Sequence, residues 1–92
     1  MKTLQVVVTD AVGLHARPAA LFVKLSNRFG AVIRIRNLSD SGEWVNAKSI
    51  LSLLTAGVKQ NDLIEIQADG PDEEAAATKL EALVRADFAM EI

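Results

Sequence analysis

The sequence predicts an α+β fold in which helices pack on one face of a mainly antiparallel sheet. Four short segments, either rich in β-branched residues or alternating between apolar and polar residues, indicate strands. Three further segments carry helix start or stop signals. The resulting order is βαββαβα, and its short, hairpin-like links favour antiparallel pairing, with the helices gathered on one side.

The first strand and the first helix are separated by a short turn. Residues 3–9 contain three consecutive valines with polar ends, a pattern typical of a strand. Gly13 is the expected turn residue. Pro18 is tolerated in a first helical turn, so the helix is expected to begin near Ala16. We expect it to run to about residue 29 and to end at Gly30.

The middle of the chain predicts a hairpin followed by a short helix. Residues 31–37 alternate between apolar and charged side chains, which indicates a strand with one solvent-exposed face. A polar turn over 39–43 leads into a short returning strand at 44–47. Residues 49–54 are expected to form a short helix that closes near Gly57.

The last strand and helix complete the predicted order. Residues 62–68 alternate again, and residues 70–74 begin a helix whose first-turn acids face its positive end. We expect this helix to reach about Ala89 and to bury Ala76, Leu80, Leu83 and Val84. The sheet face away from the helices is expected to be solvated and carries Arg34, Arg36, Glu65 and Gln67.

Composition limits the classes of protein and site. The 92 residues, half of them apolar, predict a single domain over 1–92 that folds without a metal or a disulfide. The absence of cysteine excludes thiol catalysis and cysteine-based zinc sites. A net charge of −2 is too mild to predict a nucleic-acid partner. No apolar run approaches the roughly 20 residues that span a membrane, so we expect a cytoplasmic protein.

His15, the only histidine, is the first candidate for chemistry. Imidazole suits a reversible nucleophile, because one ring nitrogen can attack while a hydrogen bond holds the other. A helix N-terminus adds unpaired N–H donors and a positive dipole end, which favour a phosphoryl group. The guanidinium of Arg17 could donate charge-assisted hydrogen bonds to the oxygens of that phosphoryl group. The residues alone leave open an ordinary surface histidine beside a helix cap.

A basic stripe on the first helix is the second candidate. Arg17, Leu21, Lys24 and Arg28 follow one another at helical spacing and begin beside His15. Such a stripe suits docking to an acidic protein surface. The alternative is a solvated charged face.

The short helix at 49–54 carries the third and fourth candidates. If Leu53 enters the core, some of Ile50, Leu51 and Leu54 are exposed and form an apolar contact surface. The alternative is a core that wraps around this helix. Ser49 is predicted to be the N-cap, and the competing interpretation is a regulatory phosphorylation site. No phosphate-binding glycine loop and no metal-ligand cluster is present in the sequence, so no cofactor is expected.

Residues 12–20, VGLHARPAA, resemble the phosphohistidine motif of HPr, the phosphocarrier family of the bacterial phosphoenolpyruvate-dependent sugar phosphotransferase system. Residues 48–51, KSIL, resemble the family's second motif, around its regulatory serine. The resemblance extends over nearly the whole chain, including Gly57 and Gly70. It implies an open-faced β-sandwich of four antiparallel strands and three helices.

The resemblance also implies roles and partners. His15 would carry the phosphoryl group on its δ nitrogen, with the assistance of Arg17, receiving it from phosphorylated enzyme I and passing it to a IIA domain of a sugar permease. Ser49 matches the serine that HPr kinase/phosphorylase modifies in many Gram-positive bacteria. The implied docking surface consists of Ala20, Leu21, Lys24, Arg28, Lys48, Ile50, Leu51 and Leu54. Transient contacts of this kind favour a monomer.

Two other functions compete with the sugar-branch phosphocarrier. One is a regulatory adaptor that acts by binding, with Ser49 as its switch. Adaptor relatives of the family lack the active histidine, so the presence of His15 argues against a pure adaptor. The other is a carrier with the same chemistry in a nitrogen-related branch or a dihydroxyacetone kinase system. The sequence does not name the sugar or the acceptor.

Overall fold

The computed structural model describes residues 1–11 and 13–90. The elements follow the predicted order: β1 (Lys2–Val7), α1 (Ala16–Ser26), β2 (Val32–Asn37), β3 (Val45–Asn46), α2 (Ile50–Thr55), β4 (Leu63–Asp69) and α3 (Glu73–Arg85). Within the described residues no helix is long and apolar enough to cross a bilayer.

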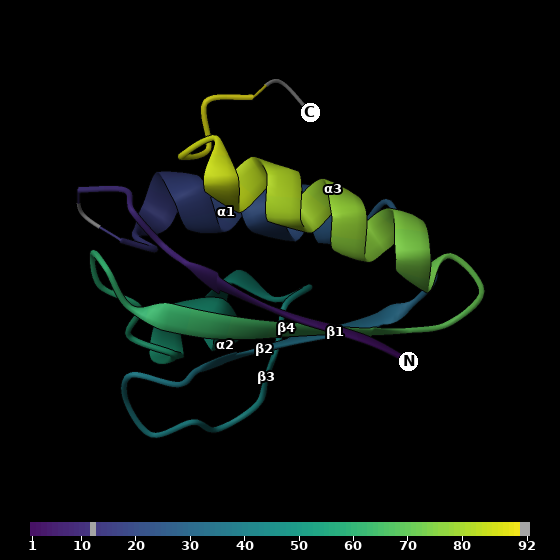
Figure 1. Cartoon of the computed structure of the whole chain (residues 1–92), viewed down its shortest axis with the longest axis horizontal. Helices are drawn as coiled ribbons and strands as arrows, with labels where there is room; N and C mark the ends of the chain where they lie inside the picture. The colour runs from purple at the N-terminus through teal and green to yellow at the C-terminus, as the bar shows by residue number, and fades with distance from the viewer. Residues whose placement is uncertain (12, 91–92) are drawn as a thin grey trace.

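The four strands form one antiparallel sheet in the order β1-β4-β2-β3. Helices α1 and α3 lie together over one side of it (Figure 1), and α2 packs against α1 and β3. The fold is therefore the open-faced β-sandwich with three helices on one face that the sequence predicted.

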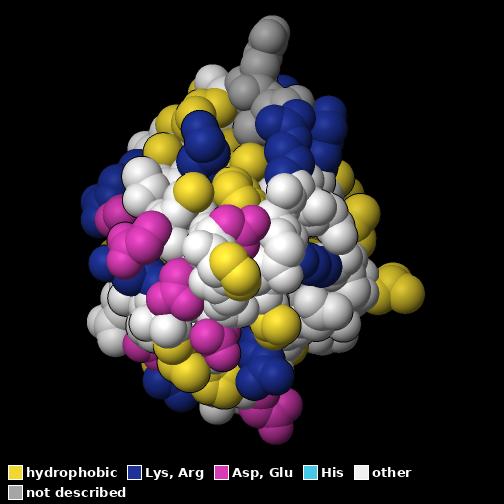
Figure 2. All heavy atoms as spheres, turned by 90° about the vertical axis from the view of Figure 1, so that its right-hand side faces the viewer, with side chains coloured by type: hydrophobic (Ala, Val, Ile, Leu, Met, Phe, Trp, Pro, Cys, Tyr) yellow, Lys and Arg dark blue, Asp and Glu magenta, His cyan; other side chains and the backbone are white. Residues whose placement is uncertain are grey.

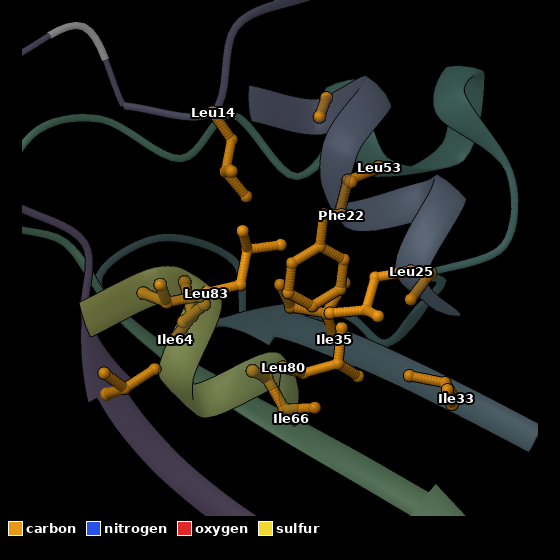
Figure 3. Packing of buried hydrophobic residues seen from close by; sticks show 14 of the residues in the cluster. Leu14, Phe22, Leu25, Ile33, Ile35, Leu53, Ile64, Ile66, Leu80 and Leu83 are labelled. Atoms are coloured by element: carbon orange, nitrogen blue, oxygen red, sulfur yellow. The ribbon is translucent and has the colours of Figure 1, made fainter. Parts of the chain in front are cut away.

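Strand alternation sends one set of side chains into the core. Ile33 and Ile35 of β2 and Ile64 and Ile66 of β4 are fully buried beneath the helices. Phe22 of α1 points into the middle of this cluster (Figure 3), and it is also fully buried. The same core holds α1 and α2 in fixed positions, and both helices carry candidate functional residues.

The open face of the sheet is less solvated than the sequence predicted. Glu65 is only 9% exposed, because the Arg36 guanidinium covers it, with Nε and a terminal nitrogen 2.6 and 2.5 Å from its Oε1. The indole of Trp44 stacks on the same guanidinium at 4.5 Å. Arg34 on the same face is exposed, as expected.

The first helix ends earlier than predicted. Its last residue is Ser26 rather than residue 29, because the chain tightens into i→i−3 bonds from Arg28 to Leu25 and from Phe29 to Ser26. The side chain of Asn27 also donates to the carbonyl of Val23. Local hydrogen bonds therefore end the helix before Gly30, the residue at which the sequence predicted its end.

The last helix also ends early, at Arg85 rather than Ala89. Phe88 N–H donates to the carbonyl of Leu83 and Asp87 N–H to that of Val84, both at 3.0 Å. This is the Schellman pattern, with Asp87 in the left-handed position at φ 52°. The buried Phe88 packs into the core rather than continuing the helix. As a result, the end of α3 turns back toward the N-terminal end of α1.

Candidate functional site

His15 is the N-cap of α1 and lies at the surface. Its backbone is extended, at φ −96° and ψ −169°, and its carbonyl accepts the first helical hydrogen bond from Ala19 at 2.9 Å. The side chain makes no capping bond, and 42% of it is exposed. The imidazole is therefore directed to solvent at the start of the helix rather than used to close it.

The loop before His15 is held against the segment that follows α2. Leu14 is buried, and its N–H donates to the carbonyl of Val58 at 3.1 Å. Gly13 takes φ +76° and packs directly on the same backbone. Two of the residues before His15 are therefore fixed by tertiary contacts, whereas Val12 of the predicted motif lies outside the described residues.

A small open hollow of about 60 Å³ adjoins the imidazole. A hollow of this volume suits a small group. Its walls come from the loop before α1, the first turns of α1 and the end of α3, and they comprise Asp10, His15, Arg17, Pro18, Leu21, Asp87 and Phe88.

The charges around the hollow are mixed. Arg17 is exposed at its rim, and Oδ1 of Asp10 lies 3.8 Å from Nε2 of His15. The first-turn N–H groups of a helix lack partners within the helix, and Pro18 has none to offer. The donors nearest the imidazole are therefore those of Ala16 and Arg17, and the first turn of α1 contains no acidic side chain to compete with an incoming anion.

Asp87 is a second carboxylate at this site, and the sequence analysis did not predict it. It lines the hollow, and its Oδ1 accepts a hydrogen bond from the hydroxyl of Thr9. Its position depends on the early end of α3, because a helix continued to Ala89 would direct this residue elsewhere. No pattern in the local sequence signals that placement.

The predicted basic stripe is exposed along α1 and continues into the turn after it, where Arg28 lies beyond the helix end. Arg17, Ala20, Lys24 and Arg28 are exposed, and Leu21 between them is half-buried. On the face of the molecule drawn in Figure 2, acidic and basic side chains are instead interspersed, and no histidine is visible. The charged residues of the stripe beside His15 are all basic, whereas the face in Figure 2 carries both signs of charge.

Helix α2 presents an apolar surface next to α1. Leu53 is fully buried, whereas Leu51 is 80% exposed and Ile50 and Leu54 are about half as exposed, at 41% and 40%. The core therefore does not wrap around this helix. Ser49 is its N-cap, and its Oγ accepts a hydrogen bond from the N–H of Ser52 at 3.3 Å.

Comparison with known proteins identifies the family. The model of the PTS HPr component phosphorylation site matches residues 2–86. The chain is 45% identical over 84 residues to the phosphocarrier protein HPr of Mycoplasma pneumoniae, covering 91% of this chain and 93% of that protein. The chain belongs to the HPr family.

Other relatives and solved structures agree. The HPr-like protein Crh of Bacillus subtilis is 44% identical over 73 residues, covering 79% of this chain and 82% of that protein. The crystal structure of an HPr from Thermoanaerobacter tengcongensis superposes with a TM-score of 0.90 at 37% identity over the whole of both chains. A dimer of HPr from the same organism gives 0.75 at 37% identity, covering 98% of this chain and all of that one.

Family membership assigns the coarse activity. HPr proteins are phosphocarriers of the bacterial phosphotransferase system, and this chain is one of them. Among residues 1–11 and 13–90, no group of three or more His, Asp or Glu side chains forms a candidate metal site.

Lys48 has a structural contact in addition to its predicted place in the docking surface. Its Nζ donates to the carbonyl of Phe29 at 2.7 Å, just after the end of α1. Its own carbonyl accepts from the Asn27 side chain at 3.3 Å. Lys48 therefore links the segment before α2 to the end of α1, within the docking surface that the sequence analysis predicted.

Proposed function

We propose that this HPr-family chain accepts a phosphoryl group on His15 from phosphorylated enzyme I and donates it to IIA components of the sugar phosphotransferase system. The observation that carries the proposal is the position of the imidazole. It is 42% exposed, at the N-cap of α1, beside a hollow whose volume suits a small group. A nucleophile with these surroundings is suited to take up and release a phosphoryl group.

Arg17 is the proposed assisting residue. It lies at the rim of the hollow, two residues after His15, and its guanidinium is a planar, permanently charged donor. A phosphoryl group on the imidazole would meet this charge and the first-turn N–H groups together. The oxygens of the group in transfer would thus be neutralised without a metal ion.

The proposed docking surface joins α1 and α2. It combines basic residues of α1 and of the segments that follow it and precede α2 with the exposed apolar side chains of α2. Its members are Ala20, Leu21, Lys24, Arg28, Lys48, Ile50, Leu51 and Leu54. An apolar centre with a charged rim is typical of transient protein contacts. A partner with an acidic face and an apolar patch would fit it, and we propose such a contact for enzyme I and the IIA components.

Ser49 is the proposed regulatory site, for a kinase of the HPr kinase/phosphorylase type. The residue is half-buried at the N-cap of α2 and is followed by the exposed Ile50 and Leu51. A phosphate on this oxygen would place two negative charges inside the docking surface. Binding of acidic partners would then weaken.

We infer one domain over 1–92, working as a monomer in the cytoplasm. The solved dimer of the Thermoanaerobacter tengcongensis HPr makes light scattering at working concentration the appropriate test. A stable dimeric mass would contradict the monomer.

A relay assay tests the transfer. The chain is incubated with enzyme I, labelled phosphoenolpyruvate and a IIA domain, and label should reach IIA only when the chain is present. His15→Ala should abolish that transfer while retaining the native circular dichroism spectrum. Transfer only to acceptors of a nitrogen-related branch or a dihydroxyacetone kinase system would move the chain to that branch.

The regulatory adaptor is the second candidate, and the surface around Ser49 favours it. Ser49 lies beside an 80% exposed leucine, as a binding switch requires, and the Crh protein, an HPr-like relative, is 44% identical to this chain. If partner binding changes on Ser49→Asp while relay activity is absent, the adaptor is the better account. Unchanged binding would remove the switch.

A further inference from the structure

The carboxylate of Asp10 faces one particular nitrogen of the candidate nucleophile. Its Oδ1 lies 3.8 Å from Nε2 of His15, and its side chain is only 22% exposed. The carbonyl of Asp10 accepts a hydrogen bond from the N–H of Gly13 at 3.0 Å, so the loop turns back on itself here. The backbone therefore brings Asp10 beside the imidazole.

We propose that Asp10 is a positioning residue that holds the proton on Nε2 of His15 and so directs phosphoryl transfer to Nδ1. The proposal rests on the phosphocarrier function above, and it names the residue that selects the reacting nitrogen. Asp10 itself does not touch the phosphoryl group.

A neutral imidazole has two tautomers. One nitrogen carries a hydrogen and the other carries a lone pair, and neighbouring groups decide which is which. The negative charge of an ionised carboxylate attracts an N–H group at this distance without a direct hydrogen bond, so it favours the tautomer with the hydrogen on the nearer nitrogen. Beside Asp10 that nitrogen is Nε2, and the reactive lone pair is left on Nδ1.

Charge repulsion acts in the same direction. A phosphoryl group bound to Nε2 would bring its negative oxygens toward Asp10, and the hollow already contains the Asp87 carboxylate. On Nδ1 the group is attached to the other nitrogen of the ring, away from the Asp10 contact. Arg17, at the rim, is the cation of the hollow.

The transfer step balances without another reagent. The Nδ1 lone pair forms a bond to phosphorus as the bond from phosphorus to the donor atom breaks, and that electron pair remains on the donor. The proton stays on Nε2, so the ring becomes a phosphoimidazolium with a positive charge. The carboxylate of Asp10 then faces that charge, and the reverse step restores the neutral ring.

Nitrogen-15 NMR of the unphosphorylated protein measures the tautomer directly, at about pH 8.5, where an ordinary imidazole is neutral. Wild type should show mainly the Nε2–H form. Asp10→Asn should lower the ratio of Nε2–H to Nδ1–H by about two- to five-fold, the range that an exposed charge pair supplies. Asp10→Glu should restore most of the ratio. Asp40→Asn, which removes an exposed carboxylate from the turn after β2, is the charge-matched control and should leave it unchanged.

Phosphorylation by enzyme I provides the second readout. The initial rate in Asp10→Asn should fall by the same factor as the Nε2–H fraction, and phosphoryl-imidazole NMR should detect some Nε2-linked product. An unchanged tautomer ratio in Asp10→Asn, with all product on Nδ1, overturns the inference and leaves the phosphocarrier intact. Failure of wild type to accept a phosphoryl group overturns the proposed function instead, because the tautomer ratio is measured without phosphorylation.

Discussion

Gly13 lies directly against the backbone of Val58: a Cβ atom on Gly13 would come within 2.4 Å of the Val58 carbonyl oxygen and 2.7 Å of the Cα atom of Lys59. The next residue, Leu14, donates its N–H to the same carbonyl. This close approach fixes the loop that presents His15, and no residue other than glycine fits there.

Gly13→Ala should therefore destabilise the fold in two ways. Its φ of +76° strains an alanine, and the added methyl overlaps backbone that has no flexible side chain to move. We expect a loss of about 2–4 kcal/mol in the free energy of unfolding, measured by urea denaturation.

Gly42→Ala is the matched control, because Gly42 has φ +72° but nothing within 4 Å of its Cβ position. Its free energy of unfolding should fall only by the cost of the strained backbone, about 1–2 kcal/mol. Equal losses in the two variants would contradict the close approach at Gly13.

The two leucines of α2 should separate docking from stability. Leu53→Ala removes a fully buried side chain and should cost about 2–5 kcal/mol of folding free energy. Leu51→Ala should change that free energy by less than about 0.5 kcal/mol, because the side chain is 80% exposed. Its effect should appear as slower transfer to and from partners, measured in the relay assay. Val32→Ala, an exposed apolar residue on the open sheet face, is the control and should transfer normally.

Ser49 should contribute to stability as an N-cap whether or not it is modified. Ser49→Ala loses the bond from Ser52 N–H, and we expect about 1 kcal/mol of destabilisation, measured by thermal unfolding. Ser49→Asp retains a capping oxygen, so it should lose less stability while weakening binding to an acidic partner. If Ser49→Ala weakened binding as strongly as Ser49→Asp, charge would not be the cause.

Asp72 makes the fold sensitive to acid. Hydrogen bonds from the backbone N–H of Gly30, and then of Ala31, lower the pKa of Asp72 below its ordinary value of 3.8. A carboxylate with a lowered folded pKa stabilises the native state above its unfolded value, and that contribution is lost as the pH falls through the folded value. Asp72→Asn should thus be less stable than wild type at neutral pH.

The difference between Asp72→Asn and wild type should shrink steadily below about pH 4, as measured by urea denaturation across the range. Asp69→Asn removes a neighbouring carboxylate without touching these two bonds, and it provides the control. A difference that stays constant down to low pH would contradict the assignment.

Periodic patterns made most of the fold predictable. Alternation placed Ile33, Ile35, Ile64 and Ile66 in the core, and the seven elements appear in the predicted order. The predicted ends of α1 and α3 were wrong, because hydrogen bonds in the last turn end each helix before the position that the glycine and apolar signals indicated. The burial of Glu65 was also missed, since it depends on Arg36 of β2 and on Trp44 just before β3, which stacks on that guanidinium.

The site was predictable where it is local in sequence. His15 and Arg17 lie two residues apart at a helix start, and the hollow contains both. Asp10 lies near them in the sequence and became a candidate only when its distance to Nε2 was known. Asp87 is far along the chain, and its place depends on how α3 ends and packs. Contacts made by tertiary packing leave no periodic signal.

Intact-mass spectrometry after incubation with phosphoenolpyruvate and enzyme I tests the role of His15 most directly. The account predicts one added phosphoryl group that is lost in acid and absent from His15→Ala. No addition to a folded chain, with the enzyme active on another HPr, would contradict it, as would addition that persists in His15→Ala.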